Sequence, residues 1–284
     1  MKLLFSSDLH GDEAHYTRLL NVARQNRPQL IILGGDMLPD DSALEPDQMG
    51  HGQPAYVRGP FRKYIASLRE ASGCESVMTI FGNHDWGSSV TAMAELEGDG
   101  LLNVLSLEKP TLFKGISFLG YSSTPPTPWF VKDFERLDQP KDKPPLLGGA
   151  RWDARFNRPC TLSATALFGM SRTMVAELAD LKRPPDPWVF VAHAPPAESL
   201  LDRYYGNLAW GSKAVRDAIE KHQPMLSLHG HIHQAHEVTG HFMDKIGRTV
   251  AVNPGQTHSK LNHVLIEVDP AKGAVLNVTH GQAT

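Results

Sequence analysis

Short, almost continuous apolar runs alternate with amphipathic stretches near the start of the chain. Residues 3–7 and 29–33 are such runs, and residues 15–25 between them place apolar side chains at helical spacing. Near-continuous apolar runs are typical of parallel strands covered on both faces. The pattern therefore predicts a strand–helix–strand unit in which two parallel strands are neighbours.

The same alternation continues toward the end of the chain and predicts an α/β fold. We expect further strands at 76–81, 102–105, 116–121, 188–192, 225–228, 249–252 and 264–268, and helices at 61–71, 162–181 and 212–222. The sequence shows no internal repeat and no linker. Residues 1–284 are therefore expected to form a single domain.

Residues 122–158 interrupt this alternation. Prolines break any period there, at Pro125, Pro126, Pro128, Pro140, Pro144 and Pro145. A structureless loop of this size is unusual in a compact domain and is often functional. We expect the insertion to form a lid or rim over the functional site, with a plain surface insertion as the alternative.

Composition and charge narrow the class of protein. The 41% of hydrophobic residues support a large core, and the net charge of −3 argues against a broad basic field for nucleic acid. Cys74 and Cys160 are too few for a disulfide framework, so both are expected to be reduced. The apolar start is shorter than a signal core, and no run is long enough to span a membrane. We therefore expect a cytoplasmic protein without membrane association.

Asp, Asn and His side chains follow several predicted strands at the point where each strand ends. The motifs are Asp8-Leu9-His10, Gly35-Asp36, Gly82-Asn83-His84-Asp85, His193 before Ala194-Pro195-Pro196, and Gly230-His231-Ile232-His233. Open α/β sheets hold their ligands at the carboxyl ends of their strands, where these motifs would converge. On an extended backbone, residues two apart, such as Asp8 and His10, would point to the same side. Carboxylates with imidazoles favour Mn, Fe or Zn, and the lack of thiolates argues against a cysteine-rich zinc site.

The order of these motifs resembles the calcineurin-like metallophosphoesterase superfamily. Each motif alone is weak, but the resemblance spans residues 8–233 with every block in the expected order. It implies an α/β fold built as a layered β-sandwich flanked by helices, with the metal site at the carboxyl ends of the strands. It also implies a binuclear hydrolase that acts on a small-molecule phosphoester.

The resemblance further implies a role for each motif residue. One ion would take Asp8, His10 and His233, the other Asn83, His193 and His231, and Asp36 would bridge them with one oxygen to each ion. A hydroxide shared by two divalent ions, with Mn favoured in vitro, would attack phosphorus in line with the leaving group. His84 would protonate the leaving alkoxide. Asp85 would orient the His84 ring or, alternatively, only cap the loop.

Departures from known branches of the superfamily bear on the substrate. Its Ser/Thr phosphatases follow Gly-Asp with Asp-Arg-Gly, whereas Gly35-Asp36 is followed here by residues 37–42, Met-Leu-Pro-Asp-Asp-Ser. The missing arginine would clamp a dianionic monoester, so the pattern leans toward small phosphodiesters and resembles class III cyclic-nucleotide phosphodiesterases. A clamp from Arg58, Arg62, Arg151 or Arg155 stays open. The alternatives are a phosphomonoesterase or nuclease and, with least support, a non-catalytic interaction module.

Some residues near the motifs have two interpretations. Trp129, Phe130 and Trp152 lie in or beside the insertion, where one could stack on a base or an aryl leaving group, or serve as a core or surface anchor. His229 shares a face with His231, but we expect it to be a packed or supporting histidine. Asp12 is expected to supply a charge at a helix N-terminus.

Overall fold

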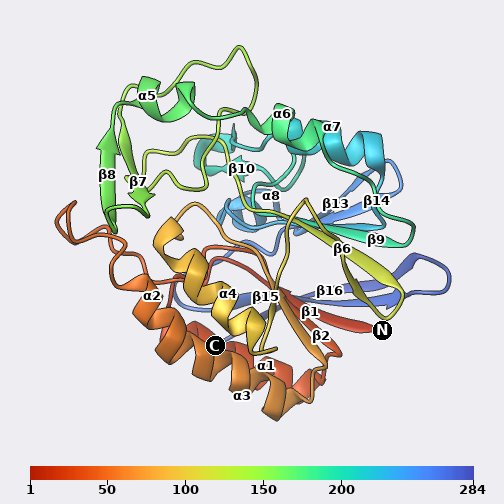
Figure 1. The fold of residues 1–284 in the computed structure, drawn as a ribbon. Coiled ribbons are helices and arrows are strands. Elements are labelled where there is room, and N and C mark those ends of the chain that lie inside the picture. Colours follow the sequence, from red (N-terminus) through yellow and green to blue (C-terminus); the bar gives the residue numbers. More distant parts are fainter.

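Two six-stranded β-sheets form the centre of the protein, in a computed structural model that describes residues 1–284 (Figure 1). The first sheet contains, in spatial order, β16 (Ala274–Ala283), β15 (Leu261–Asp269), β1 (Lys2–Ser6), β2 (Leu30–Leu33), β3 (Ser76–Thr79) and β4 (Asn103–Val104). The second contains β13 (Met243–Ile246), β14 (Thr249–Val252), β12 (Leu226–Leu228), β9 (Trp188–Ala192), β6 (Ile116–Tyr121) and β5 (Thr111–Phe113). The predicted α/β sandwich is therefore confirmed.

Both sheets have a parallel centre. In the first sheet β1 pairs in parallel with β2, and β2 with β3, as the strand–helix–strand pattern predicts. In the second sheet β9 pairs in parallel with both β6 and β12. Antiparallel strands lie toward the edges, with β15 against β1, β13 against β14 and β5 against β6. The parallel centre brings the ends of β1, β2, β3, β9 and β12 together.

The apolar runs are continuous because both faces of each central strand are covered. Leu3 and Phe5 of β1 point into the cluster between the two sheets, where they join residues such as Val189 of β9. Leu4 points the other way, into the cluster beneath the helices. Alternate side chains of a strand face opposite sides, so each run supplies two cores.

Helices cover the outer faces of the two sheets (Figure 1). Those on the first sheet are α1 (Glu13–Asn26), α3 (Arg62–Ser72) and α4 (Val90–Gly98), with α2 (Gln53–Tyr56) and a π-helical turn (Val57–Phe61) leading into α3. Those that pack near the second sheet are α6 (Met174–Ala179), α7 (Lys213–His222) and α8 (Ala235–Thr239). The Asp12 side chain caps α1 by accepting the N–H of Ala14 at 2.7 Å, which agrees with the expected helix N-terminal position.

The long helix predicted over 162–181 is wrong. The segment forms two short helices, α5 (Ala164–Gly169) and α6, and the Thr173 side chain caps the second. Gly169 and the Ser171-Arg172-Thr173 sequence separate them, since glycine and hydroxyl residues favour caps over helix interiors.

The rim insertion, which we define as residues 122–158, contains ordered structure despite its prolines. Its last residues form β7 (Gly149–Asp153), which pairs with β8 (Arg158–Leu162) as an antiparallel hairpin. A second small hairpin, β10 (Arg203–Tyr204) with β11 (Leu208–Ala209), lies between the metal-motif segments of the second sheet. Figure 1 shows β7, β8 and α5 together at one end of the molecule.

Candidate metal centre

Four of the motif residues have a left-handed backbone. The φ angles are 59° at Asp8, 47° at His10, 53° at Asp36 and 66° at His231. Non-glycine residues rarely adopt this region, and each instance costs on the order of 1–3 kcal/mol. The extended backbone expected for Asp8–His10 is therefore wrong: these residues lie in turns after β1, and the turn geometry aims their side chains.

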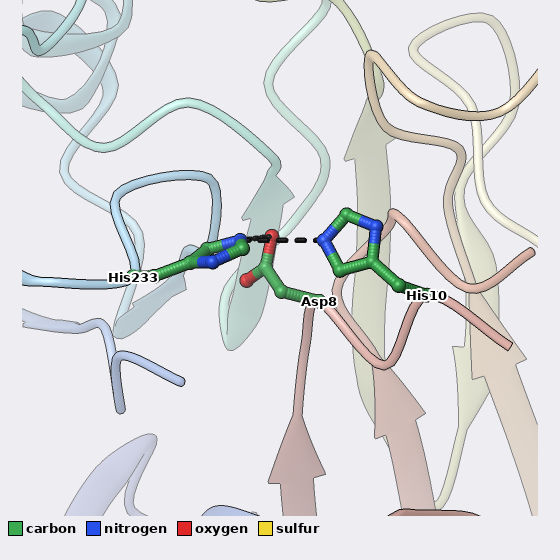
Figure 2. Close-up of side chains that lie close together, drawn as sticks. All are labelled: Asp8, His10 and His233. Carbon is green, nitrogen blue, oxygen red and sulfur yellow. Dashed lines mark hydrogen bonds and ion pairs between the residues drawn. The ribbon is translucent and has the colours of Figure 1, made fainter. Parts of the chain in front are cut away.

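Asp8, His10 and His233 form the first group of potential ligands (Figure 2). His233 Nε2 lies 3.3 Å from Asp8 Oδ1, and it lies 3.4 Å from His10 Nε2. The ligand atoms of the three residues lie within 4.8 Å of one another. Asp8 follows β1 and His233 follows β12, so the two sheets contribute together.

Asp8, Asp36 and His193 form the second group, which shares Asp8 with the first. His193 Nε2 lies 3.2 Å from Asp36 Oδ2 and 3.9 Å from Asp8 Oδ1. Asp36 Oδ2 is also 4.0 Å from His10 Nε2, so this oxygen faces both groups. The other oxygen, Asp36 Oδ1, accepts the N–H of His84 at 2.7 Å. Asp36 Oδ2 therefore lies between the two groups while Oδ1 holds the loop of His84, and the bridging of two ions by Asp36 stays a prediction.

Asn83 and His231 border the second group. His231 Nδ1 lies 2.8 Å from Asn83 Oδ1, and the ring centroids of His231 and His193 are 5.3 Å apart. The backbone N–H of His231 donates to both oxygens of Asp8, at 3.0 and 3.1 Å. All seven expected ligands are thus assembled, and we call Asp8, His10, Asp36, Asn83, His193, His231 and His233 the metal cradle.

One buried polar atom of the metal cradle, Asn83 Nδ2, has no hydrogen-bond partner, and His193 Nε2 meets the Asp36 carboxylate at 3.2 Å. On the other side of its ring, His193 Nδ1 lies 2.7 Å from the carbonyl oxygen of Gly34, which can only accept, so Nδ1 carries the proton. That hydrogen bond leaves the lone pair of neutral His193 on Nε2, directed at the carboxylates. Buried polar groups in proteins are normally paired. The Asn83 amide N–H groups can only donate, so they suit the oxygen of a water or a substrate, whereas Nε2 of neutral His193 could bind an ion.

Glycine is required where the motif loops approach the cradle. A Cβ at Gly82 would clash with the Asp36 carboxylate and lie 2.6 Å from His193 Nε2. A Cβ at Gly230 would clash with Ser7 and with the Asp8 carboxylate. The glycines of Gly-Asn-His-Asp and Gly-His-Ile-His therefore give the carboxylates room.

The charges of the metal cradle are strongly coupled. Burial raises the pKa of Asp8, but His233 and His193 outweigh it and lower the pKa to about 2. Burial acts against His193 too, yet Asp36 and Asp8 raise its pKa to about 9. Burial lowers the pKa of His10 to about 4 and, together with the charge of His193, that of His231 to about 3. Without an ion, these pKa values favour an ionised Asp8, a cationic His193, and neutral His10 and His231.

His84 lies beside the cradle, with its ring centroid 4.8 Å from that of His10. Its Nδ1 is 3.6 Å from Asp40 Oδ2. Burial pulls the pKa of His84 down, but the charges of Asp36 and Asp40 outweigh it and raise the pKa above its usual value. The nearby carboxylates therefore favour the protonated imidazole, which is the form that can donate a proton.

Asp85 makes no hydrogen bond to the His84 ring, so the contacts do not support the prediction that it orients this ring. The Asp85 carboxylate accepts backbone N–H groups of Asp36, Leu38 and Gly82, at 3.1, 3.0 and 2.8 Å. Both its oxygens are thus used to hold the two motif loops, which matches the loop-cap alternative. Burial and the charge of Asp36 raise the pKa of Asp85 to about 7, and Asp85 adds only the smallest of the contributions that raise the pKa of His84.

Asp40 and Gln53 are site residues that sequence reasoning missed. Asp40 supplies the carboxylate nearest to His84 Nδ1. Gln53 holds the loop from both sides, because it donates to the carbonyl of His84 at 3.0 Å and accepts the N–H of Trp86 at 2.7 Å. A carboxylate shortly after Gly35-Asp36 was a usable signal for Asp40, whereas no pattern marks Gln53.

His229 supports the cradle through its ring. Its Nδ1 lies 2.9 and 3.0 Å from the carbonyl oxygens of Ala192 and Ala194, on either side of His193. Its Nε2 lies 2.7 Å from Ser227 Oγ, and burial lowers its pKa to about 4. Both ring nitrogens are thus engaged, as expected for a supporting histidine.

The four arginines considered as clamps have partners elsewhere. Arg58 pairs with Glu95 and Arg62 with Asp99. Arg151 donates to Ser171 Oγ at 2.7 Å, and Arg155 lies over the ring of Phe156. None of these contacts involves a residue of the metal cradle.

The fold and the cradle define a metal-binding α/β sandwich, and the comparisons identify its family. The calcineurin-like phosphoesterase family matches residues 1–235, so the chain belongs to this family of phosphoester hydrolases, which typically use divalent metal ions. No functionally curated protein matches the chain.

Solved structures agree with this fold. One crystal structure is 17% identical and aligns over 100% of this chain and 99% of its own, with a TM-score of 0.66. The protein TT1561 of Thermus thermophilus is also 17% identical, over 99% of this chain and 98% of its own, with a TM-score of 0.58. A putative 5'-nucleotidase from Staphylococcus aureus, in complex with alpha-ketoglutarate, is 13% identical over 99% of this chain and 54% of its own, with a TM-score of 0.52. At these identities the likeness shows the fold alone.

The helices are all too short or too polar to cross a membrane.

Proposed function

We propose that the protein hydrolyses small phosphodiesters with the help of two divalent metal ions held in the metal cradle. The observation that carries this proposal is the pair of ligand groups that share Asp8, with Asp36 Oδ2 facing both. The buried His193 Nε2, directed at the Asp36 carboxylate, and the unpaired donor Asn83 Nδ2 at the same place support a site that an ion and its bound oxygens would complete.

The donor set fits divalent transition metals. Asp8, His10 and His233 would hold one ion, and Asn83, His193 and His231 the other, with Asp36 between them. Two such ions supply Lewis acidity, which lowers the pKa of water and neutralises phosphoryl oxygens. Imidazole and carboxylate together favour Mn, Fe or Zn, and we propose Mn for assays in vitro.

The side chains of the protein supply the proton and the geometry. His84 donates a proton to the leaving oxygen, because the nearby carboxylates raise its pKa and favour its protonated form, and because its ring lies beside the cradle. Asp40 keeps that ring charged and oriented through Nδ1, which leaves Nε2 to face the substrate. Asp85 and Gln53 hold the loop that carries His84. His84 is therefore the catalytic residue, and Asp40 is a positioning residue.

The preference for diesters rests on the charge around the cradle. A monoester carries two negative charges near neutral pH and is usually held by a guanidinium fork. The candidate arginines are engaged elsewhere, and Asp40 adds negative charge on the side of His84. A diester carries one charge and needs less cationic help. A phosphomonoesterase is the second candidate, because the same cradle would serve it.

We further propose that residues 1–284 act as one metallophosphoesterase domain, with the rim insertion forming a wall of the site. The insertion is joined to the His84 loop, since the Asp133 carboxylate accepts the N–H of Gly87 at 2.9 Å and that of Trp152 at 2.9 Å. These contacts favour a fixed rim over a mobile lid.

The test is hydrolysis of bis-p-nitrophenyl phosphate and p-nitrophenyl phosphate by metal-free protein titrated with Mn. We expect faster turnover of the diester, saturation at two ions per chain, and loss of at least about 10⁴-fold in Asp36→Asn, the scale of removing one member of a catalytic unit. Turnover of the monoester alone would favour the second candidate. Stoichiometric loading without turnover of either ester would overturn the proposal.

A further inference from the structure

Trp129 of the rim insertion lies directly beside the proposed proton donor. The ring centroids of Trp129 and His84 are 4.9 Å apart, and the planes are tilted by 59°. Trp129 is 46% exposed, so much of the indole remains open to solvent. An exposed indole is a large apolar surface, and such surfaces beside a reacting group commonly bind part of a ligand.

The hollow between Trp129 and His84 has mixed walls. The hollow is shallow: Trp86 and Met49 form its buried floor, Trp129 and Phe130 border it, and Asp40 and Asp41 contribute carboxylates. A planar group would therefore lie on the exposed indole and not inside the hollow. Asp41 is already engaged, because its Oδ1 accepts the Trp86 Nε1–H at 3.0 Å. Aromatic walls attract a planar group, and the negative charge disfavours one that carries a further phosphate.

The turn that carries Trp129 is held by a buried ion pair. Lys132 Nζ lies 2.8 Å from Glu135 Oε2, and the side chains are 1% and 0% exposed. Both grip Thr127, since Lys132 donates to its carbonyl oxygen at 2.8 Å and Glu135 accepts its N–H at 3.1 Å. Thr127 Oγ1 in turn accepts the N–H of Trp129 at 3.3 Å. A buried pair adds little net stability, but it can specify one conformation, here that of the turn presenting Trp129.

We propose that Trp129 is a stacking surface that selects phosphodiesters whose leaving alcohol carries an uncharged, planar aromatic group. This inference rests on the proposed function, because the leaving group is assigned to this side through His84. A ring that stacks on Trp129 places its ester oxygen near the His84 imidazole. The aromatic group is that of a nucleoside or a simple aryl alcohol, which share this chemistry.

The test measures binding to Mn-loaded full-length protein by calorimetry, with ligand pairs that differ in aromaticity. Methyl phenyl phosphate is compared with methyl cyclohexyl phosphate, and the methyl diester of adenosine 5'-monophosphate with that of ribose 5-phosphate. We expect wild type to prefer the aromatic member by about tenfold, within the range of base–aromatic stacking. Trp129→Ala should abolish this preference and Trp129→Phe should retain most of it.

A matched control uses another half-exposed tryptophan, Trp210, which directly follows β11. It is 44% exposed and stacks on Tyr204 at 4.2 Å, so Trp210→Ala should leave the aromatic preference unchanged. The kcat/KM for methyl p-nitrophenyl phosphate should fall about tenfold in Trp129→Ala. A larger preference within the adenosine pair would identify a nucleoside as the aromatic group, and a larger one within the phenyl pair an aryl alcohol.

The experiment distinguishes a failure of the stacking role of Trp129 from a failure of the proposed function. Equal losses for aromatic and aliphatic ligands in Trp129→Ala would show that Trp129 only supports the His84 loop, and would overturn the stacking role. An unchanged aromatic preference would overturn it too, while normal diester turnover keeps the proposed function. Absence of turnover in the wild-type protein would overturn the proposed function and, with it, the leaving-group assignment.

Discussion

The metal cradle and the rim insertion both bury charged groups, but the two regions differ in how fully these groups are hydrogen-bonded. In the rim insertion, Lys132 donates to Thr127 and Glu135, and both oxygens of Glu135 accept hydrogen bonds. In the cradle, Asn83 Nδ2 has no hydrogen-bond partner, His193 Nε2 meets only carboxylates, and the backbone of Asp8 is left-handed. Buried charged groups with a full set of hydrogen bonds are typical of a structural scaffold. Buried polar groups that lack partners are typical of a site that binds a ligand.

The largest effect should follow from breaking the saturated pair. Lys132→Met leaves Glu135 buried without its cation, which should lower the free energy of unfolding by about 3–5 kcal/mol. Replacing both partners, as Lys132→Met with Glu135→Leu, should recover most of the loss. Urea denaturation of the metal-free protein measures both.

Asp36→Asn is the matched change in the cradle. Asparagine keeps the shape and can still accept the N–H of His84, and His193 can lose its proton once the carboxylate is gone, so metal-free stability should fall by less than in Lys132→Met. If this substitution destabilised the protein as much as Lys132→Met, the contrast between the two regions would be lost.

The next effect concerns proton donation by His84. His84→Gln removes the donor and should lower kcat by about 100-fold for a diester with a poor leaving group, and by less for a p-nitrophenyl ester. Asp40→Asn removes a charge that raises the pKa of His84, so the imidazole should lose its proton at lower pH. The alkaline limb of the kcat profile should then move to lower pH. An unchanged limb would exclude His84 as the acid.

The smallest effect is the pH dependence of metal binding. His193 of the metal-free protein has a pKa near 9 and must lose a proton to act as a ligand. Below that pH, Mn affinity should rise with pH by about tenfold per unit for each proton displaced. Calorimetry in buffers of different ionisation enthalpy counts the released proton. Affinity that is independent of pH between 7 and 9 would show that His193 is not a ligand.

Periodicity and strand-end motifs predicted much of the fold and the membership of the site. The apolar runs at β1, β2, β6 and β9 identified strands because each is covered on both faces. The motifs converge because parallel strands end at one edge of a sheet. The ligand roles of the assembled residues stay a prediction, which the metal titration tests.

Local sequence could not resolve features that depend on competing hydrogen bonds. The segment 162–181 has helical periodicity throughout. The first helix nevertheless ends at Gly169, and the Thr173 side chain caps a second helix. The strand β16 was missed because its solvent-facing residues weaken the apolar pattern, although it pairs with β15 along its length. In both cases the structure depends on hydrogen-bond partners that the periodicity of the segment does not identify.

The sequence by itself determined which chemical groups end the strands and, through their order, the family. The tertiary structure alone decided which carboxylate serves His84, because Asp85 turns toward backbone N–H groups while Asp40 approaches from the loop after β2. It also placed Trp129 beside His84, although the two residues are 45 positions apart in the sequence. Trp129 lies in the insertion, where the prolines leave no periodicity to interpret. Strand ends are fixed by local periodicity, whereas loop contacts depend on the packing of segments far apart in the chain.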